Sequence, residues 1–316
     1  MTPTVELQRR IHGLDVHVRL VGDGPPVLLI NGIGTHTGTW AALEAALPDL
    51  RLIEYDAPGS GRSATPRIPR TIPALARLAA GVLDAAGVEQ ADVVGYSLGG
   101  IVAQQLAARS PERVRRLVLA ATGCGWGAIP GDLRAMREIA VPTQRAARAL
   151  YHRSLGDLVG GRARRDTAWV DELWQTRMHA PPTTGGYLGQ LFAVAAWSTL
   201  PALGRIRHPT LVVAGGDDPV SPAANAVLLA ERIPNARLRM APDEGHLLLM
   251  DERSSTLPWI REFLTAERLE AAAVWDRAQV VPEQLVRDAL AGAGRRGWPA
   301  LAISSLLRRR GPVHRS

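Results

Sequence analysis

The sequence predicts an α/β protein with a mainly parallel central sheet and an inserted helical segment. Short runs rich in β-branched residues or leucine recur along the chain, and most of them alternate with helical patterns. Parallel strands need a crossover connection, which a helix usually supplies, so this alternation indicates βα units. The alternation stops near residue 125 and resumes near residue 208, which indicates an insertion.

The expected elements follow one another along the chain. We expect strands at 15–21, 27–30, 51–55, 91–94, 116–120, 210–214 and 236–240. The first two of these are expected to be antiparallel at the start of the sheet. Helices are expected at 73–86, ending at Gly87, at 101–110, stopping before Pro111, and at 223–232.

Two stretches interrupt or follow this pattern. Between residues 125 and 207, aromatic residues lie among helical and Gly/Pro-rich segments, so we expect a helical cap inserted into a core of residues 1–124 and 208–265. Aromatic residues in a cap form its own core or line a substrate pocket, and a lid over a site does both. Residues 266–316 are expected to form an extension with helical patterns at 268–278, 282–290 and 299–307, either packed on the core or binding a surface.

Composition excludes several classes of protein. The 316 residues contain 46% hydrophobic residues and no apolar run long enough for a signal peptide or a membrane span, so we expect a soluble, cytoplasmic protein. The single Cys124 cannot form an internal disulfide or a cysteine-based metal site. The net charge of +7 comes from scattered arginines without a recognition motif, so we expect no nucleic-acid partner.

The most informative motif is the run GYSLG at residues 95–99. It follows an apolar strand and precedes a helix, which is the setting of a GxSxG nucleophile elbow. Such a tight turn strains its central residue and brings the flanking positions into close contact, so Gly95 and Gly99 lack side chains for a steric reason. The motif therefore predicts that Ser97 is a nucleophile.

A serine nucleophile needs a base, and the base needs an acid that orients it. The chain order Ser, Asp, His places the acid in the loop after the strand at 210–214, where Asp217 and Asp218 are adjacent. We prefer Asp218 because of its spacing from Gly215 and the proline four residues later, which leaves Asp217 as a turn residue. His246 lies in the loop after the last strand and is the predicted base.

Acyl transfer also needs donors for the negative charge that develops on the substrate oxygen. The loop after the strand at 27–30 reads NGIG at residues 31–34, and an ordinary turn is the alternative explanation of its glycines. We assign the oxyanion hole to the backbone amides of Ile33 and Leu98, the latter being the residue after the nucleophile. Asp56, in a further loop, is expected to fix that loop rather than to react.

Together these elements resemble the α/β-hydrolase superfamily over residues 10–265. Within it the chain is most similar to the intracellular medium-chain poly(3-hydroxyalkanoate) depolymerases. The similarity extends over eight short segments: NGIG at 31–34, DAPG at 56–59, SATPR at 63–67, AQQ at 103–105, PER at 111–113, LVLAAT at 117–122, QLFA at 190–193 and RIPNA at 232–236. Leu98 departs from the tryptophan expected there, and the tail beyond residue 266 is longer than the family pattern.

The resemblance implies that Ser97, Asp218 and His246 form a catalytic triad. It also implies hydrolysis of hydroxyalkanoate esters through an acyl-serine intermediate, with no metal or organic cofactor. Related polymer synthases carry cysteine at the elbow, whereas haloalkane dehalogenases and epoxide hydrolases carry aspartate, so Ser97 favours hydrolysis of an ester. The expected partner is an ester substrate, and a polyester granule surface is a further candidate.

Two other functions remain open from the sequence. One is a small-molecule carboxylesterase or lactonase, which would use the same triad on a shorter substrate. The other is a non-catalytic, hydrolase-like ligand or granule-binding protein, because a fold alone does not establish turnover.

Overall fold

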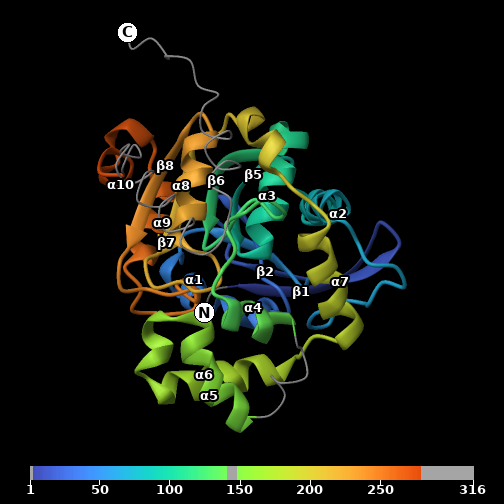
Figure 1. The fold of residues 1–316 in the computed structure, drawn as a ribbon. Coiled ribbons are helices and arrows are strands. Elements are labelled where there is room, and N and C mark those ends of the chain that lie inside the picture. The colour runs from blue at the N-terminus through green and yellow to red at the C-terminus, as the bar shows by residue number, and fades with distance from the viewer. Residues whose placement is uncertain (1–2, 141–147, 279–316) are drawn as a thin grey trace.

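The computed structural model describes residues 3–140 and 148–278 and contains one eight-stranded sheet (Figure 1). The strand order is β1-β2-β4-β3-β5-β6-β7-β8, and all neighbours from β4 to β8 are parallel. The mainly parallel sheet of the prediction is therefore confirmed. The strands span Thr4–Ile11 (β1), Leu14–Val21 (β2), Pro26–Ile30 (β3), Arg51–Tyr55 (β4), Ala91–Tyr96 (β5), Val114–Ala120 (β6), Thr210–Gly215 (β7) and Ala236–Ala241 (β8).

The start of the sheet agrees with the expectation in part. The strands β2 and β3 run in opposite directions, as expected, but they are not paired with each other: β2 lies antiparallel between β1 and β4, and β3 is parallel to β4 and β5. The strand β1 was not among the expected strands. This edge strand is polar and mostly exposed, so it lacks the apolar run by which the other strands were recognised.

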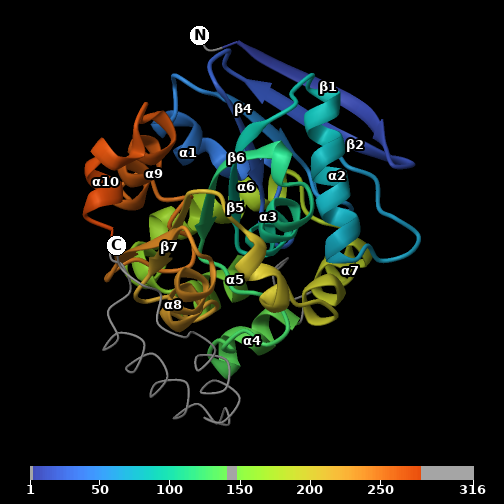
Figure 2. The ribbon, with the colours of Figure 1, turned by 90° about the horizontal axis from the view of Figure 1, so that it is seen from above.

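Helices cover both faces of the sheet, which explains why the central strands read as continuous apolar runs. Figure 2 shows α2 (Ile72–Ala85) and α3 (Leu98–Arg109) on one side, and α1 (Ala41–Ala46) and α9 (Thr256–Thr265) on the other. The helix α8 (Ala223–Arg232) belongs to the same core layer as α2 and α3. All six residues of β5 are buried between these layers.

The chain between β6 and β7 is helical where the structure describes it. It contains α4 (Leu133–Ala140), α5 (Arg148–Val159), α6 (Thr167–His179) and α7 (Thr184–Ala195), together with the short 3₁₀ helices η4 (Gly161–Arg164) and η5 (Leu200–Arg205). Residues of α4, α5 and α6 form a small apolar cluster separate from the two large core layers. In Figure 1 these three helices lie beyond one edge of the sheet, whereas α7 runs alongside it.

The described part of the C-terminal extension packs on the core. After α9 the chain forms a 3₁₀ helix (Leu269–Ala271) and the short helix α10 (Ala273–Asp276), where one helix was expected over 268–278. Trp275 stacks on Phe263 with ring centroids 5.5 Å apart, and Arg116 donates to the carbonyl oxygen of Phe263 at 2.7 Å. The helices expected at 282–290 and 299–307 lie outside the described residues. Within residues 3–140 and 148–278, no helix has the length and apolar character needed to cross a membrane.

One buried carboxyl group in β4 makes stability depend on pH. Burial raises the pKa of Glu54 to about 8, the nearby Glu44 carboxylate adds to the effect, and Arg19 opposes it. A raised folded-state pKa contributes stability below the ordinary glutamate value of 4.5, and this contribution is lost as the pH rises towards 8.

We therefore expect the free energy of unfolding to fall by a few kcal/mol as the pH rises from about 5 to about 8. In Glu54→Gln this dependence should be much weaker, because the amide does not titrate. Urea unfolding at several pH values measures the difference. The matched control is Glu112→Gln at an exposed carboxyl group. A slope in Glu54→Gln equal to that of the wild type contradicts the assignment.

Candidate active site

The turn after β5 places Ser97 in a strained backbone conformation. Its φ of 53° and ψ of −119° lie in a region that residues with a side chain rarely adopt. The turn needs its glycines, because a Cβ on Gly99 would lie 1.9 Å from the Ile30 carbonyl oxygen and one on Gly95 would lie 2.7 Å from Gly100 Cα. The Thr122 hydroxyl donates to the Ser97 carbonyl oxygen at 2.6 Å and so helps to fix the turn.

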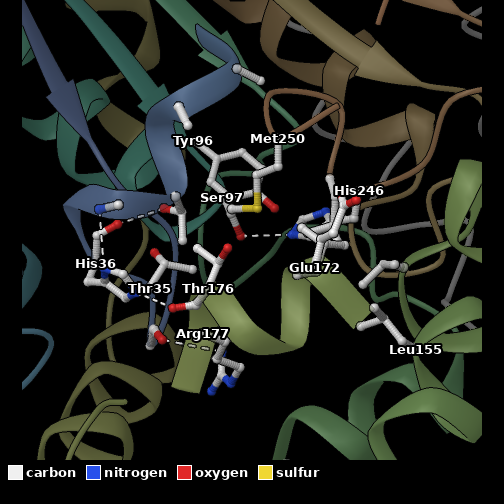
Figure 3. A pocket seen from close by; sticks show the side chains of 18 of the residues that line it. Thr35, His36, Tyr96, Ser97, Leu155, Glu172, Thr176, Arg177, His246 and Met250 are labelled. Carbon is white, nitrogen blue, oxygen red and sulfur yellow. Dashed lines mark hydrogen bonds between the residues drawn. The ribbon is translucent and has the colours of Figure 1, made fainter. Parts of the chain in front are cut away.

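Two further loops at the same edge of the sheet bring a histidine and an aspartate to Ser97. His246, which follows β8, has Nε2 3.0 Å from Ser97 Oγ and Nδ1 2.8 Å from Asp218 Oδ2. The Asp218 loop follows β7, and the second carboxylate oxygen accepts the amides of Val220 and Ser221, each at 2.8 Å. The side chains of His246 and Asp218 are 8% and 1% exposed. The three predicted residues therefore form one hydrogen-bonded chain, which Figure 3 shows from Ser97 to His246.

The adjacent Asp217 points away from this chain and contacts the inserted helices. Its carboxylate accepts the Gly161 amide at 2.8 Å and pairs with the Arg164 guanidinium at 2.8 Å, and its side chain is 40% exposed. The hydrogen bond from Arg164 lowers the pKa of Asp217 below its ordinary value. In the same region His246 donates its backbone amide to the Val159 carbonyl oxygen at 2.7 Å. The loops carrying Asp218 and His246 are thus both attached to residues 159–164.

The loop at residues 31–34 borders the same cavity as His246. Ile33 and Ser97 both line the cavity described below, while Leu98 follows Ser97 directly and begins α3. The Asn31 side chain holds the start of the loop, because its oxygen accepts the Gly32 amide at 2.8 Å and its nitrogen donates to Thr39 Oγ1 at 2.7 Å. The Leu98 side chain is buried in the core layer that contains α3.

The neighbouring Asp56 loop is held by hydrogen bonds to its buried carboxylate. The carboxylate accepts the amides of Thr37 and Arg62, each at 2.8 Å, and lies 3.1 Å from His17 Nδ1. Burial alone would raise the pKa of Asp56, but these hydrogen bonds, that of His17 above all, lower it. These contacts agree with a role in fixing the loop.

A cavity of about 410 Å³ opens on Ser97 and His246. Its wall is mostly apolar, and many of its larger apolar side chains come from α5, α6 and the loop after His246: Leu155, Leu158, Val159, Trp169, Leu173, Leu247 and Met250. Glu172, Thr176 and Arg177 of α6 add a polar strip, and Figure 3 shows α6 passing close to the serine and the histidine. A pocket of this size with a few polar groups is typical of a site for a small organic ligand or for the end of a longer one.

The aromatic residues of the inserted segment have different environments. Trp169 is 4% exposed, belongs to the small apolar cluster and also lines the cavity, so it fulfils both of the roles considered for such residues. Tyr187 is buried, whereas Trp126 and Phe192 are 73% and 51% exposed and do neither.

Two residues close to the hydrogen-bonded chain or to the loop of Ile33 were not among the expected site residues. The Tyr96 ring lies 5.4 Å from the His246 ring, between centroids, and it also lines the cavity. Gln190 of α7 is buried and contacts the loop of Ile33. Its only sequence signal was membership of the QLFA segment used in the resemblance. Tyr96 had no signal beyond its place inside the elbow motif.

The described residues support neither a cysteine nucleophile nor a metal site. Burial raises the pKa of the Cys124 thiol to about 11, so this thiol is not an activated nucleophile. Within residues 3–140 and 148–278, no group of three or more His, Cys, Asp or Glu side chains has an arrangement that could hold a metal ion.

Comparisons with known proteins agree with this architecture. The family model of the α/β-hydrolase fold matches residues 25–253. A poly(3-hydroxyalkanoate) depolymerase of Ectopseudomonas oleovorans is 41% identical over 249 residues, covering 78% of this chain and 86% of that protein. A putative carbamate hydrolase (RutD) of Azorhizobium caulinodans is 36% identical, covering 71% and 85% of the two chains.

The solved structures give the same result. The enol-lactonase from Burkholderia xenovorans superposes with a TM-score of 0.71 at 25% identity, covering 82% of this chain and all of that one. The family model covers well over half of the chain, and the first two relatives exceed 30% identity over more than two thirds of it. These relatives support a hydrolase function, and the chain belongs to the α/β-hydrolase fold family.

Proposed function

We propose that this protein is a serine ester hydrolase that cleaves poly(3-hydroxyalkanoate) or its oligomers through an acyl-serine intermediate. The observation that carries the proposal is the hydrogen-bonded chain from Ser97 through His246 to Asp218, of which Ser97 and His246 line a mostly apolar cavity. The similarity to the depolymerase of Ectopseudomonas oleovorans supports the choice of substrate.

In the proposed mechanism, Ser97 Oγ attacks the ester carbonyl carbon and His246 Nε2 takes the hydroxyl proton. Asp218 holds the imidazole in the required tautomer and stabilises its positive charge. The amides of Ile33 and Leu98 donate to the oxyanion of the tetrahedral intermediate. The ester C–O bond then breaks as His246 gives the proton to the departing alkoxide oxygen, and water repeats the sequence on the acyl-serine to release the acid and regenerate Ser97.

We further propose that residues 125–207 form a cap over a core of residues 1–124 and 208–265. The cavity wall supports this division, because α5 and α6 supply several of its larger apolar side chains, while the reacting groups come from the loops after β5, β7 and β8. An apolar wall suits the alkyl side chains of a medium-chain polyester. The proposed place of action is the cytoplasm, at the surface of the stored polymer.

The decisive assay uses amorphous medium-chain polyester granules, with p-nitrophenyl octanoate as a parallel ester. The wild type is expected to release hydroxyalkanoate monomers or oligomers and to sediment with the granules, while Ser97→Ala is expected to release none. Cleavage of the octanoate without any polymer release would contradict the polymer substrate. Wild-type protein that binds granules but cleaves neither compound would instead establish a non-catalytic binding protein.

A small-molecule carboxylesterase or lactonase is the second candidate. The similarity to the enol-lactonase and to the putative carbamate hydrolase favours it, because those names describe small substrates. A ratio of turnover on short esters to turnover on oligomers that strongly favours the former would identify this activity.

A further inference from the structure

One glutamine of the cap makes three hydrogen bonds to two loops of the core. Gln190 on α7 is 3% exposed, and its Oε1 accepts the backbone amide of Gly34 at 2.8 Å. Its Nε2 donates to the Pro58 carbonyl oxygen at 3.1 Å and to Ser60 Oγ at 3.0 Å. Because one end faces a donor and the other faces a carbonyl acceptor, these partners fix the orientation of the side-chain amide.

The Gly34 contact lies next to the proposed oxyanion donor. On the other side of Ile33, the Gly32 amide is held by Asn31 Oδ1 at 2.8 Å, and the Gly32 carbonyl oxygen accepts the Thr35 hydroxyl at 2.7 Å. The peptide units that flank Ile33 are therefore both anchored. The anchor on the Gly34 side comes from the cap, whereas those on the Gly32 side come from the loop itself.

The helix α7 packs closely against these two loops. A Cβ on Gly34 would lie 2.7 Å from the Tyr187 ring, and one on Gly59 would lie 2.3 Å from Gly186 Cα. Tyr187 and Gly186 both belong to α7, so this helix touches the two core loops almost directly. Arg177 of α6 adds a long contact at 3.3 Å from Nη1 to the Gly34 carbonyl oxygen.

We propose that Gln190 is a positioning residue that sets the oxyanion hole. By holding the Gly34 peptide, it fixes the backbone of Ile33 and thereby the direction of the Ile33 N–H. This inference deepens the proposed function and rests on it. Because an oxyanion exists only in the tetrahedral intermediate and the transition states near it, loss of the anchor should slow turnover while substrate binding is retained.

The test compares Gln190→Met with Gln105→Met. Methionine has a similar volume but cannot replace the amide's hydrogen bonds. Gln105 is an equally suitable buried glutamine, 3% exposed, which accepts Trp197 Nε1 at 3.3 Å. Removing an oxyanion donor outright costs about 10²–10³-fold in kcat, so displacing one should cost about 10–100-fold. We expect that loss of kcat on p-nitrophenyl octanoate in Gln190→Met, with KM within about threefold.

Two further measurements separate positioning from a general structural role. The inhibition constant of an octyl trifluoromethyl ketone should rise in Gln190→Met by about the same factor as kcat falls, because its adduct also carries an oxyanion. Hydrogen exchange at the Gly34 amide should be faster in Gln190→Met than in the wild type or in Gln105→Met. If the methionine variant does not fold, Gln190→Glu serves in its place. Its carboxylate retains an acceptor for the Gly34 amide, so its kcat should fall by less than about tenfold.

Several results would overturn the inference. These are an unchanged kcat in Gln190→Met, an increase confined to KM, or an equal loss in Gln105→Met. Unchanged exchange at Gly34 contradicts it whatever the activity of the wild type. A wild type that cleaves no ester, yet shows the expected change in exchange, contradicts the proposed function and leaves the Gly34 hydrogen bond established.

Discussion

Replacing Ser97 by alanine should lower kcat on p-nitrophenyl octanoate by at least about 10⁵-fold while the protein remains folded. The hydroxyl group is all that the substitution removes. Its oxygen lies 3.0 Å from His246 Nε2 and Ser97 lines the cavity, so the hydroxyl does not pack in the core. The backbone strain at a φ of 53° is similar for serine and alanine, because both carry a Cβ. Stability should therefore change by less than about 1 kcal/mol.

Steady-state kinetics and thermal unfolding of Ser97→Ala measure these two quantities. A fluorophosphonate should label the wild type at Ser97, as located by mass spectrometry, and should not label the variant. Ser221→Ala is the matched control, since Ser221 lies in the Asp218 loop and contributes its backbone amide there. Retention of more than about 1% of wild-type turnover in Ser97→Ala would refute the nucleophile.

Asp218→Asn should lower kcat by about 10³–10⁴-fold. The carboxylate accepts from His246 Nδ1 at 2.8 Å and is 1% exposed, so its charge acts on the imidazole with little screening by water. An asparagine in this place can offer its NH₂ group to Nδ1, which favours the wrong tautomer and removes the charge that stabilises the imidazolium.

The neighbouring Asp217→Asn is the internal control for that result. Asp217 contacts Arg164 and Gly161 rather than His246, and its side chain is 40% exposed. We expect its kcat to remain within about tenfold of the wild type, with a lower melting temperature because an ion pair to Arg164 and a charged hydrogen bond to Gly161 are weakened. The opposite ranking of the two variants in kcat would exchange their roles.

Local sequence signals predicted the parts of the site that lie at the ends of apolar strands. The GYSLG run and the paired aspartates follow β5 and β7, whose residues are all buried, and His246 follows the half-buried β8; parallel strands present their carboxyl ends at one edge. The choice between Asp217 and Asp218 rested on spacing alone. The geometry now gives the two residues different partners, and kinetics will decide their roles.

Features that depend on tertiary contacts could not be predicted from local sequence patterns. The polar pattern of β1 carries no core face, so nothing local marks it as a strand. Gln190 lies 156 residues from Gly34 along the chain, and an isolated glutamine in a helical pattern has no distinctive signal. The raised pKa of Glu54 likewise depends on tertiary structure, because it comes mainly from the burial of Glu54 and then from the approach of Glu44 in α1.

The contact between Gly59 and Gly186 has a consequence for building chimaeras of this protein. Each glycine occupies the space that a side chain on the other would need, with a Cβ on Gly186 only 2.4 Å from the Gly59 carbonyl oxygen. A cap transplanted from another hydrolase would carry its own residue at the position of Gly186. Unless that residue is also glycine, the transplanted segment should be held away from the core, and Gly34 should lose its hydrogen bond to Gln190. A chimaera designed to change the substrate range should therefore keep glycine at both positions.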